Sequence, residues 1–525
     1  MKKMYLVVLS TFALTFLSCE MDKESPDSIP LAHAFDNMGN IEALERGAYS
    51  RLRAVFSPEA VTAADLQADY AHAVRGYSNT YGNFYQWKYT TDDAEISDTW
   101  NSLYVAIANY NFIIDGIDSL GFEPDNSQRD VLNRIQGTAY LMRAISYSML
   151  AERFCGDYEA TSSGKQYSGL PLAKTYDKSI KPDRSTLEET YQLILDDLRR
   201  ARDLLANVPG EPNSTELNID CVTALEAHVY LQMDNYPKAL EKAEELIGNT
   251  AYHLVDSQEE LGRMWTYDQS PETIFQFYAS RTELAYQWGY YFWNDNNNGT
   301  DPEVNLMMPD YIPTQDCLDM YDDGDWRRNV YFSECSFNQL YDGKMRVPFI
   351  KGQDAFADYM VLFSKYPGNP DLRTSATWNY CNTFKVFRLA EMYLIAAEAA
   401  AQMPGENPAE PLGELREHRG LAPFPEGYDV TLDDVKEERY REMILEGSRL
   451  TDLKRWKEGM SRGTPQTGYI SETGTNPWKE GDFVTEQGTR LEKKTDDYMF
   501  VWPIPASEIF ANKAYADQQN PGWKR

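Results

Sequence analysis

The chain has 525 residues, of which 42% are hydrophobic, so it is long enough for two or three average domains and can bury a large core. Asp and Glu total 82 against 50 Lys and Arg, giving a formal net charge of −32. This negative excess repels nucleic-acid phosphates and anionic lipid headgroups, which excludes nucleic acid as a partner and argues against a basic membrane-binding patch.

The first 18 residues have the order of an export signal. Lys2 and Lys3 form a basic start, residues 4–17 are almost wholly apolar, and Ser18 is small. The apolar run is shorter than the roughly 20 residues that span a bilayer, and no later stretch is long enough. We therefore expect residues 1–18 to be a signal peptide and the mature chain to have no spanning helix.

Cys19 directly follows this signal. The order Phe16-Leu17-Ser18-Cys19 resembles a bacterial lipobox, which implies cleavage before Cys19 and its acylation. Acyl chains gain about 0.8 kcal/mol per buried CH₂ and would anchor the protein to a membrane. The acidic residues 20–24 resemble the surface-export tether of Bacteroidetes lipoproteins, so residues 19–35 are assigned to the lipidated Cys and a flexible tether. The alternative is an ordinary cleavable signal with an incidental Cys.

The next part of the chain is typical of amphipathic helices, with apolar residues at steps of three and four. The predicted helices cover residues 41–55, 97–117, 134–154 and 185–206. For the last of these, Ser185 with Glu188 three residues later predicts a capping box.

Residues 223–248 read as two antiparallel helices joined at Asp234-Asn235. Small Ala side chains on both faces allow close approach, and Tyr side chains fill the gap between them. This spacing resembles a tetratricopeptide repeat. Residues 388–403 and 409–419 look like a degenerate copy, so we predict a mostly α fold built from tetratricopeptide-like helix pairs in an α-α superhelix.

Between residues 251 and 380 the helical period fades, and Gly, Pro, Asn and aromatic residues become more frequent. Residues 273–278 predict a short strand. We expect the rest to form long ordered loops, which are usually functional.

Five blocks together resemble the SusD/RagB family of Bacteroidetes outer-membrane lipoproteins. They are WNSLYVAIANYNFII (100–114), GTAYLMRAISYSMLAERFCGD (137–157), NTFKVFRLAEMYLIAAEAAAQ (382–402), EERYREMILEGSRLTDLKRWKEG (437–459) and FVWPIPASEIFANKAYADQQNPGWKR (500–525). Two features depart from the family pattern: Cys155 stands where a bulky residue is usual, and the segment after Asp157 is longer than usual.

The resemblance implies a SusD-like fold with a loop-rich ligand-binding face. Residues 36–250 would be the N-terminal SusD-like helical part and residues 251–525 the C-terminal SusD/RagB part. It also implies a lipid-anchored protein of the outer membrane, facing outside, that binds oligosaccharides or polysaccharides and delivers them to a SusC-like TonB-dependent transporter. Such a protein is not an enzyme and needs no cofactor.

Charged residues recur at steps of three or four between residues 437 and 456 and would line one face of a long helix. They are Arg439, Glu442, Glu446, Arg449, Asp452 and Arg455. We interpret them as a structural network of ion pairs that fixes this helix against its neighbours. The alternative is that Glu442 and Glu446 form a catalytic acid pair.

Other catalytic and metal signatures are missing: the sequence has no G-x-S-x-G, H-E-x-x-H, G-x-G-x-x-G or P-loop. The five His show no ligand spacing. Residues 294–305 echo a calcium loop, but Asn305 replaces the required Glu and Pro302 interrupts the run, so we expect a hydrogen-bonding loop near a ligand and no metal site. No C-x-x-C occurs, and beyond Cys19 we expect mainly buried free thiols, with one disulfide possible. These cysteines are Cys155, Cys221, Cys317, Cys335 and Cys381.

Two aromatic segments, residues 70–89 and 285–298, are candidates for ligand binding. A sugar ring has an apolar C–H face and a rim of hydroxyls, which suits a flat aromatic face with Asn or Arg at its edge. The predicted glycan-binding residues are Arg75, Tyr77, Asn79, Tyr81, Trp87, Trp288, Tyr290, Trp293 and Asn296. The alternative is that these rings only pack their own loops. Two other functions stay open: oligopeptide binding of the RagB type, and a surface glycoside hydrolase.

Overall fold

The computed structural model describes residues 31–159, 162–177, 179–296, 304–336, 340–341, 344–350, 355–374, 379–466, 469–471 and 484–524. The predicted signal peptide, Cys19 and residues 20–30 of the tether lie outside the described residues. Within the described part, no helix combines the length and the hydropathy that a bilayer crossing requires.

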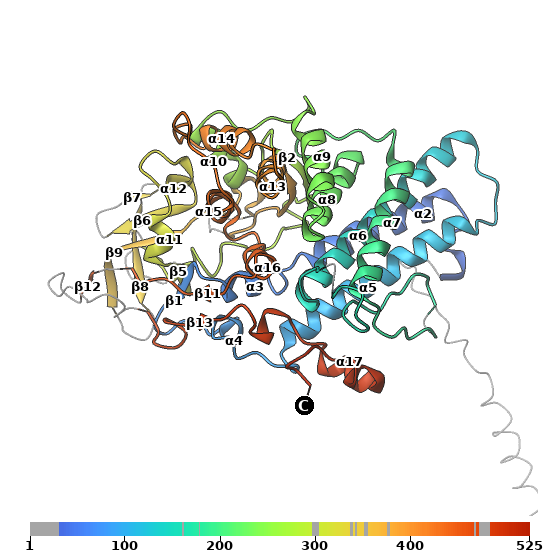
Figure 1. The fold of residues 1–525 in the computed structure, drawn as a ribbon, viewed down its shortest axis with the longest axis horizontal. Coiled ribbons are helices and arrows are strands. Elements are labelled where there is room, and N and C mark those ends of the chain that lie inside the picture. Colours follow the sequence, from blue (N-terminus) through green and yellow to red (C-terminus); the bar gives the residue numbers. More distant parts are fainter. Residues whose placement is uncertain are drawn as a thin grey trace, which may run out of the picture.

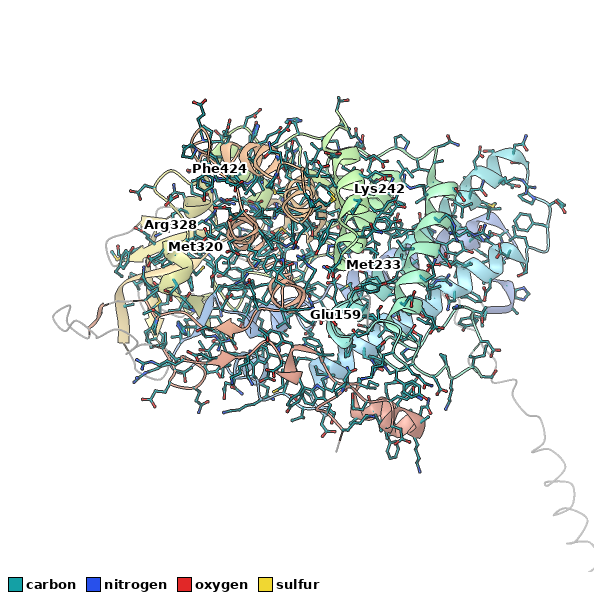
Figure 2. All side chains as sticks on the ribbon, in the orientation of Figure 1. Glu159, Met233, Lys242, Met320, Arg328 and Phe424 are labelled. Atoms are coloured by element: carbon teal, nitrogen blue, oxygen red, sulfur yellow. The ribbon has the colours of Figure 1, made fainter. Side chains whose placement is uncertain are left out.

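Helices are the main regular structure, and the long ones lie on the right and in the centre of Figure 1, with a sheet on the left. The main helices are α2 (Met38–Val55), α5 (Ala94–Asp118), α6 (Asn126–Phe154), α7 (Leu187–Leu205), α8 (Ile219–Gln232), α9 (Tyr236–Ile247), α13 (Leu389–Ala401), α14 (Ala409–Glu417), α15 (Leu432–Met443) and α16 (Arg449–Arg455). The prediction of a mostly α fold is confirmed. One hydrophobic core runs through both predicted parts of the chain, and side chains fill the space between the helices (Figure 2).

The predicted tetratricopeptide-like pair is α8 and α9, which pack against each other. Ala227 on α8, and Ala239 and Ala243 on α9, are fully buried. Without larger side chains there, the two helices approach closely. Helix α9 also packs on α13, whose side chains are almost all buried, so this pair links the N-terminal helices to the C-terminal ones.

The start of α7 differs from the prediction by one residue. Thr186, not Ser185, is the N-cap: its hydroxyl accepts the Glu189 N–H, and the Glu189 carboxylate accepts the Thr186 N–H. The Ser185 hydroxyl instead bonds to the hydroxyl of Thr190 at 2.9 Å. A cap at Ser185 with Glu188 and a cap at Thr186 with Glu189 both fit the capping-box pattern in the sequence. The observed cap is the one that buries Leu187 in the core.

The prediction of long loops between residues 251 and 380 is right only in part. Residues 277–294 form neither helix nor strand, but six strands of this region belong to a seven-stranded sheet (left in Figure 1). Its strands are β3 (Asp295–Asn296), β4 (Val304–Met307), β6 (Phe332–Ser336), β7 (Leu340–Tyr341), β8 (Lys344–Ile350), β9 (Ala355–Phe363) and β12 (Tyr469–Ser471). The strands are mostly antiparallel, but β4 runs parallel to β8. Strands β3, β7 and β12 have only two or three residues and give no usable periodicity, whereas β8 and β9 are seven and nine residues long and the pattern of this region was misread.

Three further strand pairs tie the sequence together. They are β1 (Ala71–Ala73) with β5 (Tyr311–Pro313), β2 (Thr273–Gln276) with β10 (Lys385–Arg388), and β11 (Met460–Ser461) with β13 (Glu492–Lys493). The predicted strand near residue 273 is confirmed as β2. The short helices are α3 (Thr62–Gln67), α4 (Gly82–Tyr85), α10 (Gln258–Thr266), α11 (Gln315–Asp319), α12 (Trp326–Val330) and α17 (Ala506–Ala511), with η1 (Leu31–His33), η2 (Pro370–Leu372), η3 (Tyr498–Phe500) and η4 (Lys513–Ala516).

The expected long helix over residues 437–456 is interrupted and forms α15 and α16. Between them Leu445 and Gly447 adopt positive φ values of 61° and 80°. The Gly447 N–H donates to both oxygens of buried Asp65, and a Cβ at position 447 would lie 3.0 Å from Val61. The chain turns here because Asp65 and Arg153, from the N-terminal half, take up the backbone groups of Gly447.

Candidate ligand-binding site

The antiparallel pair of β1 and β5 brings the two aromatic segments together. The Val74 N–H donates to the carbonyl of Asp310 at 2.9 Å, and the Asp310 N–H donates to the carbonyl of Tyr291 at 2.8 Å. The Asp310 carboxylate also accepts the N–H and the hydroxyl of Ser78, at 3.0 and 2.5 Å. Asp310 therefore connects both segments. Sequence reasoning missed it, since no periodicity or motif marks it.

A polar turn follows β1. The Tyr77 hydroxyl donates to the Asn79 side chain at 2.9 Å and accepts the Gln86 side-chain amide at 2.9 Å. Asn79 is exposed and Tyr77 is half-buried. The turn thus presents an amide and the edge of a ring to solvent, two groups that suit a sugar's hydroxyl rim and C–H face.

Aromatic rings meet next to this turn. Tyr81 lies edge-on to Tyr291 with ring centroids 5.4 Å apart, and Tyr290 lies edge-on to Tyr291 at 5.2 Å and to Tyr380 at 6.3 Å. Tyr290 is 40% exposed, whereas Tyr81 and Tyr380 are buried. Of the predicted residues, Tyr77, Asn79, Tyr81 and Tyr290 are therefore brought to one place, with Tyr290 as the most exposed ring.

Unusual backbone conformations concentrate in the same place. Asn79, Tyr81, Trp87 and Tyr380 all have φ values between 53° and 64°. A side chain at position 82 would clash with this turn, because a Cβ there would lie 2.2 Å from the Asn79 side chain. Left-handed backbone at non-glycine residues costs about 1–3 kcal/mol each and often marks ligand-binding sites.

The three predicted Trp platforms are corrected by the structure: Trp87, Trp288 and Trp293 are only 3%, 3% and 2% exposed. The Trp87 indole N–H donates to the Gln67 carbonyl at 2.8 Å, and the Trp288 ring lies 5.0 Å from Phe384. These indole faces are covered by protein side chains and are not open to a sugar ring. Their role here is packing.

Two predicted residues remain, Arg75 and Asn296, and neither is placed in the centre of the candidate site. Arg75 is half-buried, and its Nε–H donates to the Val484 carbonyl at 3.1 Å, so it holds the strand edge. Asn296 belongs to β3, but its side chain lies outside the described residues, as do Cys19 and residues 297–303 of the candidate calcium loop. Among the described residues, no group of three or more His, Cys, Asp or Glu side chains is placed to hold a metal ion.

Glu442 and Glu446 belong to a buried ionic network. Glu442 accepts from Arg388 at 2.6 Å and from Arg419 at 2.9 Å, while Glu446 accepts from Lys365 at 2.6 Å. Burial acts to raise the pKa of Glu442, but Arg419 and Arg388 outweigh it and hold the pKa well below its ordinary range. A carboxylate with no exposed surface and three cationic neighbours favours the structural interpretation over an acid pair that contacts substrate.

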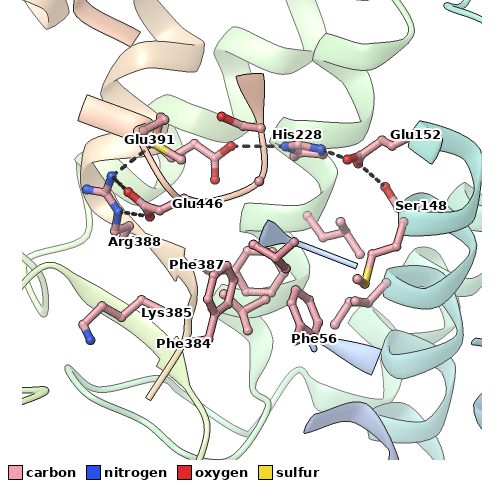
Figure 3. Close-up of a pocket in the computed structure, with 18 of the residues that line it drawn as sticks. Phe56, Ser148, Glu152, His228, Phe384, Lys385, Phe387, Arg388, Glu391 and Glu446 are labelled. Carbon is pink, nitrogen blue, oxygen red and sulfur yellow. Dashed lines mark hydrogen bonds and ion pairs between the residues drawn. The ribbon is translucent and has the colours of Figure 1, made fainter. Parts of the chain in front are cut away.

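A cavity of about 120 Å³ lies between α6, α8 and α13. In Figure 3 the rings of Phe56, Phe384 and Phe387 line one side of it, and His228 lies between Glu152 and Glu391 on the other, at 2.8 and 3.2 Å. Burial acts to lower the pKa of His228, but the two carboxylates outweigh it and raise the pKa to about 10. His228 and the two carboxylates pair with one another, and His228 and Glu152 are still partly exposed, so we interpret these charges as structural.

The predicted state of the cysteines beyond Cys19 is confirmed. All are free and buried: Cys155, Cys221, Cys317, Cys335 and Cys381.

Comparison with protein families gives two matches. A model described as the SusD family matches residues 220–523, and one described as "Starch-binding associating with outer membrane" matches residues 15–231. Among curated proteins, the chain is 23% identical over 387 residues to "SusD-like protein P25" of Formosa agariphila, covering 69% of this chain and 70% of that protein.

Solved structures give the same fold. A Bacteroides vulgatus protein, provisionally described as sugar binding, aligns with a TM-score of 0.70 and 25% identity over 92% of this chain and 98% of its own. "Surface glycan-binding protein A" of Bacteroides fluxus aligns with a TM-score of 0.64 and 19% identity over 93% of this chain and 99% of its own.

Proposed function

Because this chain belongs to the SusD family, we propose that it binds oligosaccharides at the cell surface and delivers them to a SusC-like TonB-dependent transporter. The matched description of starch binding in association with the outer membrane supports this location. Removal of residues 1–18 and acylation of Cys19 would anchor the protein there. The protein performs no bond chemistry in this role: it captures the glycan and hands it on.

The observation that carries the proposal is the convergence of two distant segments on one surface. Half-buried Tyr77 and exposed Tyr290 supply ring faces or edges, and exposed Asn79 supplies an amide beside them. Buried Asp310 and Tyr81 hold this arrangement from below, through the contacts to Ser78 and Tyr291. Stacking and neutral hydrogen bonds dominate such a surface, which suits a neutral glycan.

Calorimetry of the chain starting at Leu31 tests the proposal, with starch first and then a panel of other polysaccharides and of oligopeptides as probes. We expect Tyr290→Ala to weaken binding of whichever polysaccharide the wild type binds about tenfold, equivalent to about 1.4 kcal/mol. Tyr267→Ala is the matched control, because Tyr267 is also 40% exposed and lies outside the candidate site. Binding of peptides but of no polysaccharide would replace this proposal by the oligopeptide-binding alternative.

A further inference from the structure

A groove of about 400 Å³ lies between α2 and the segments that precede α8 and follow β2. Its lining includes Arg46, Tyr49, Ser50, Arg53, Glu216 and Tyr278. Tyr278 is 57% exposed, more than any other Tyr of the described residues, and buried Phe277 lies next to it. The groove thus has an open aromatic ring at its edge and polar side chains along one face of α2.

Fixed contacts hold the groove's walls. The Arg53 guanidinium donates to the Tyr278 carbonyl at 3.3 Å and pairs with Glu283 at 2.6 Å. The Tyr49 hydroxyl accepts the Leu217 N–H at 2.8 Å, which ties α2 to the segment before α8. The Arg53 contact therefore holds the backbone of Tyr278 next to α2.

The groove and the candidate site share one chain segment, and Glu59 contacts the candidate site. Glu59 accepts a hydrogen bond from Tyr81 at 3.5 Å. Glu283 lines the groove, and the chain runs from it through Tyr286 to Tyr290 of the candidate site. Glu59, Tyr286 and Arg53 are all partly exposed.

The charges of the groove favour a neutral occupant. Arg46 and Arg53 are accompanied by three carboxylates, Glu45, Glu216 and Glu283. A polyanionic chain would meet these carboxylates and a molecule of net charge −32. A hydroxyl-rich neutral chain instead finds donors, acceptors and a ring face, the same groups that the candidate site offers.

We infer that this groove is a second subsite for the same neutral glycan, so that the protein prefers chains long enough to contact both Tyr290 and Tyr278. The inference rests on the proposed function. It adds a length requirement: a short oligosaccharide contacts only the Tyr290 surface, whereas a long one gains the contacts of Arg46, Ser50 and Tyr278. Linking two contacts on one ligand raises affinity without changing either surface.

Calorimetry tests this with size-fractionated oligosaccharides made from the polysaccharide that the wild-type protein binds. Maltooligosaccharides from starch are the first series. We expect the wild-type affinity to rise with chain length and then level off. Tyr278→Ala should weaken the longest fraction about tenfold and leave the shortest unchanged, whereas Tyr290→Ala should weaken both. Arg46→Ala, a change on an exposed turn of α2, is a second probe of the groove, and Tyr267→Ala should change neither fraction.

Thermal unfolding of each variant shows that the fold is intact. The inference is overturned if wild type binds the glycan but both Tyr278→Ala and Arg46→Ala bind the longest fraction like wild type. It is also overturned if Tyr278→Ala weakens short and long fractions equally, because the groove would then belong to a single short site. Failure of the wild type to bind any polysaccharide is a different result, which removes the proposed function and this inference with it.

Discussion

Tyr81 and Tyr291 lie edge to face, with ring centroids 5.4 Å apart and an angle of 75° between the rings. The contact joins two segments that are far apart in the chain, and it fixes the backbone that carries Tyr290. Aromatic pairs of this geometry contribute about 0.5–1.5 kcal/mol beyond their buried area. The site is therefore built from buried rings that hold it and an exposed ring that is available to a ligand.

Removing a buried indole should destabilise the protein. We expect Trp288→Ala to lower the free energy of unfolding by about 3–5 kcal/mol, since it leaves a cavity among Phe384 and Tyr366. Urea unfolding measures this change. The control Tyr290→Ala should cost less, about 1 kcal/mol, because Tyr290 is 40% exposed whereas Trp288 is buried. A Trp288→Ala protein that is as stable as wild type but no longer binds glycan would restore Trp288 as a binding platform.

Glu442→Gln should also lower the free energy of unfolding, by about 3–5 kcal/mol, because Arg388 and Arg419 would lose the charge that compensates them in the interior. Glu437→Gln is the matched control on the same helix. Its side chain is 60% exposed, so we expect a change within about 0.5 kcal/mol. The hydrolase alternative makes the opposite prediction: an intact, stable Glu442→Gln protein that no longer releases products from glycans.

The ion pairs of His228 with Glu152 and Glu391 should make the free energy of unfolding depend on pH. The folded pKa of His228, about 10, lies above the ordinary 6.5, so its stabilisation is complete below pH 6.5 and is lost as the pH rises towards 10. The stability difference between wild type and His228→Gln should shrink by about 1.4 kcal/mol per pH unit in that window. Urea unfolding across the window measures it, and subtracting the variant removes the contribution of other titrating groups.

The same pair should weaken again in acid. Burial acts to raise the pKa of Glu391, but the His228 imidazolium outweighs it and lowers the pKa to about 2, so the stabilisation is lost as the pH falls below 4.5 towards 2. Exposed His253, changed to Gln, is the control and should leave the free energy of unfolding within about 0.5 kcal/mol of wild type. A pH-independent difference between wild type and His228→Gln would contradict an ion pair at this position.

The N-cap of α7 can be tested by a conservative pair. Thr186→Ala should lower the free energy of unfolding by about 1 kcal/mol, because the Glu189 N–H loses its acceptor. Thr186→Ser keeps the hydroxyl and should stay close to wild type. Thermal unfolding resolves the two, and equal losses in both variants would show that the Thr methyl group, not the cap, carries the effect.

The sequence was most informative where structure is local. Apolar spacing located α2, α5 and α7 to within a few residues, because a helix that packs on one side must repeat its buried side chains every three or four residues. The small residues of α8 and α9 likewise revealed a close helix pair. The sheet was missed, although β8 and β9 pair as neighbours in the sequence. The pairing of β4 with β8 and of β6 with β9 brings together strands that are not consecutive, which no local pattern encodes.

By itself, the sequence determined the helical class, the family, the absence of clustered cysteines and the two aromatic segments that build the candidate site. Only the tertiary structure decided which of those rings meet solvent. A Trp or Tyr looks the same in the sequence whether or not a distant residue covers it: Phe500 lies against Trp87 and Phe384 against Trp288, while Tyr290 stays 40% exposed. Exposure is set by contacts between remote parts of the chain, and no local pattern encodes those contacts.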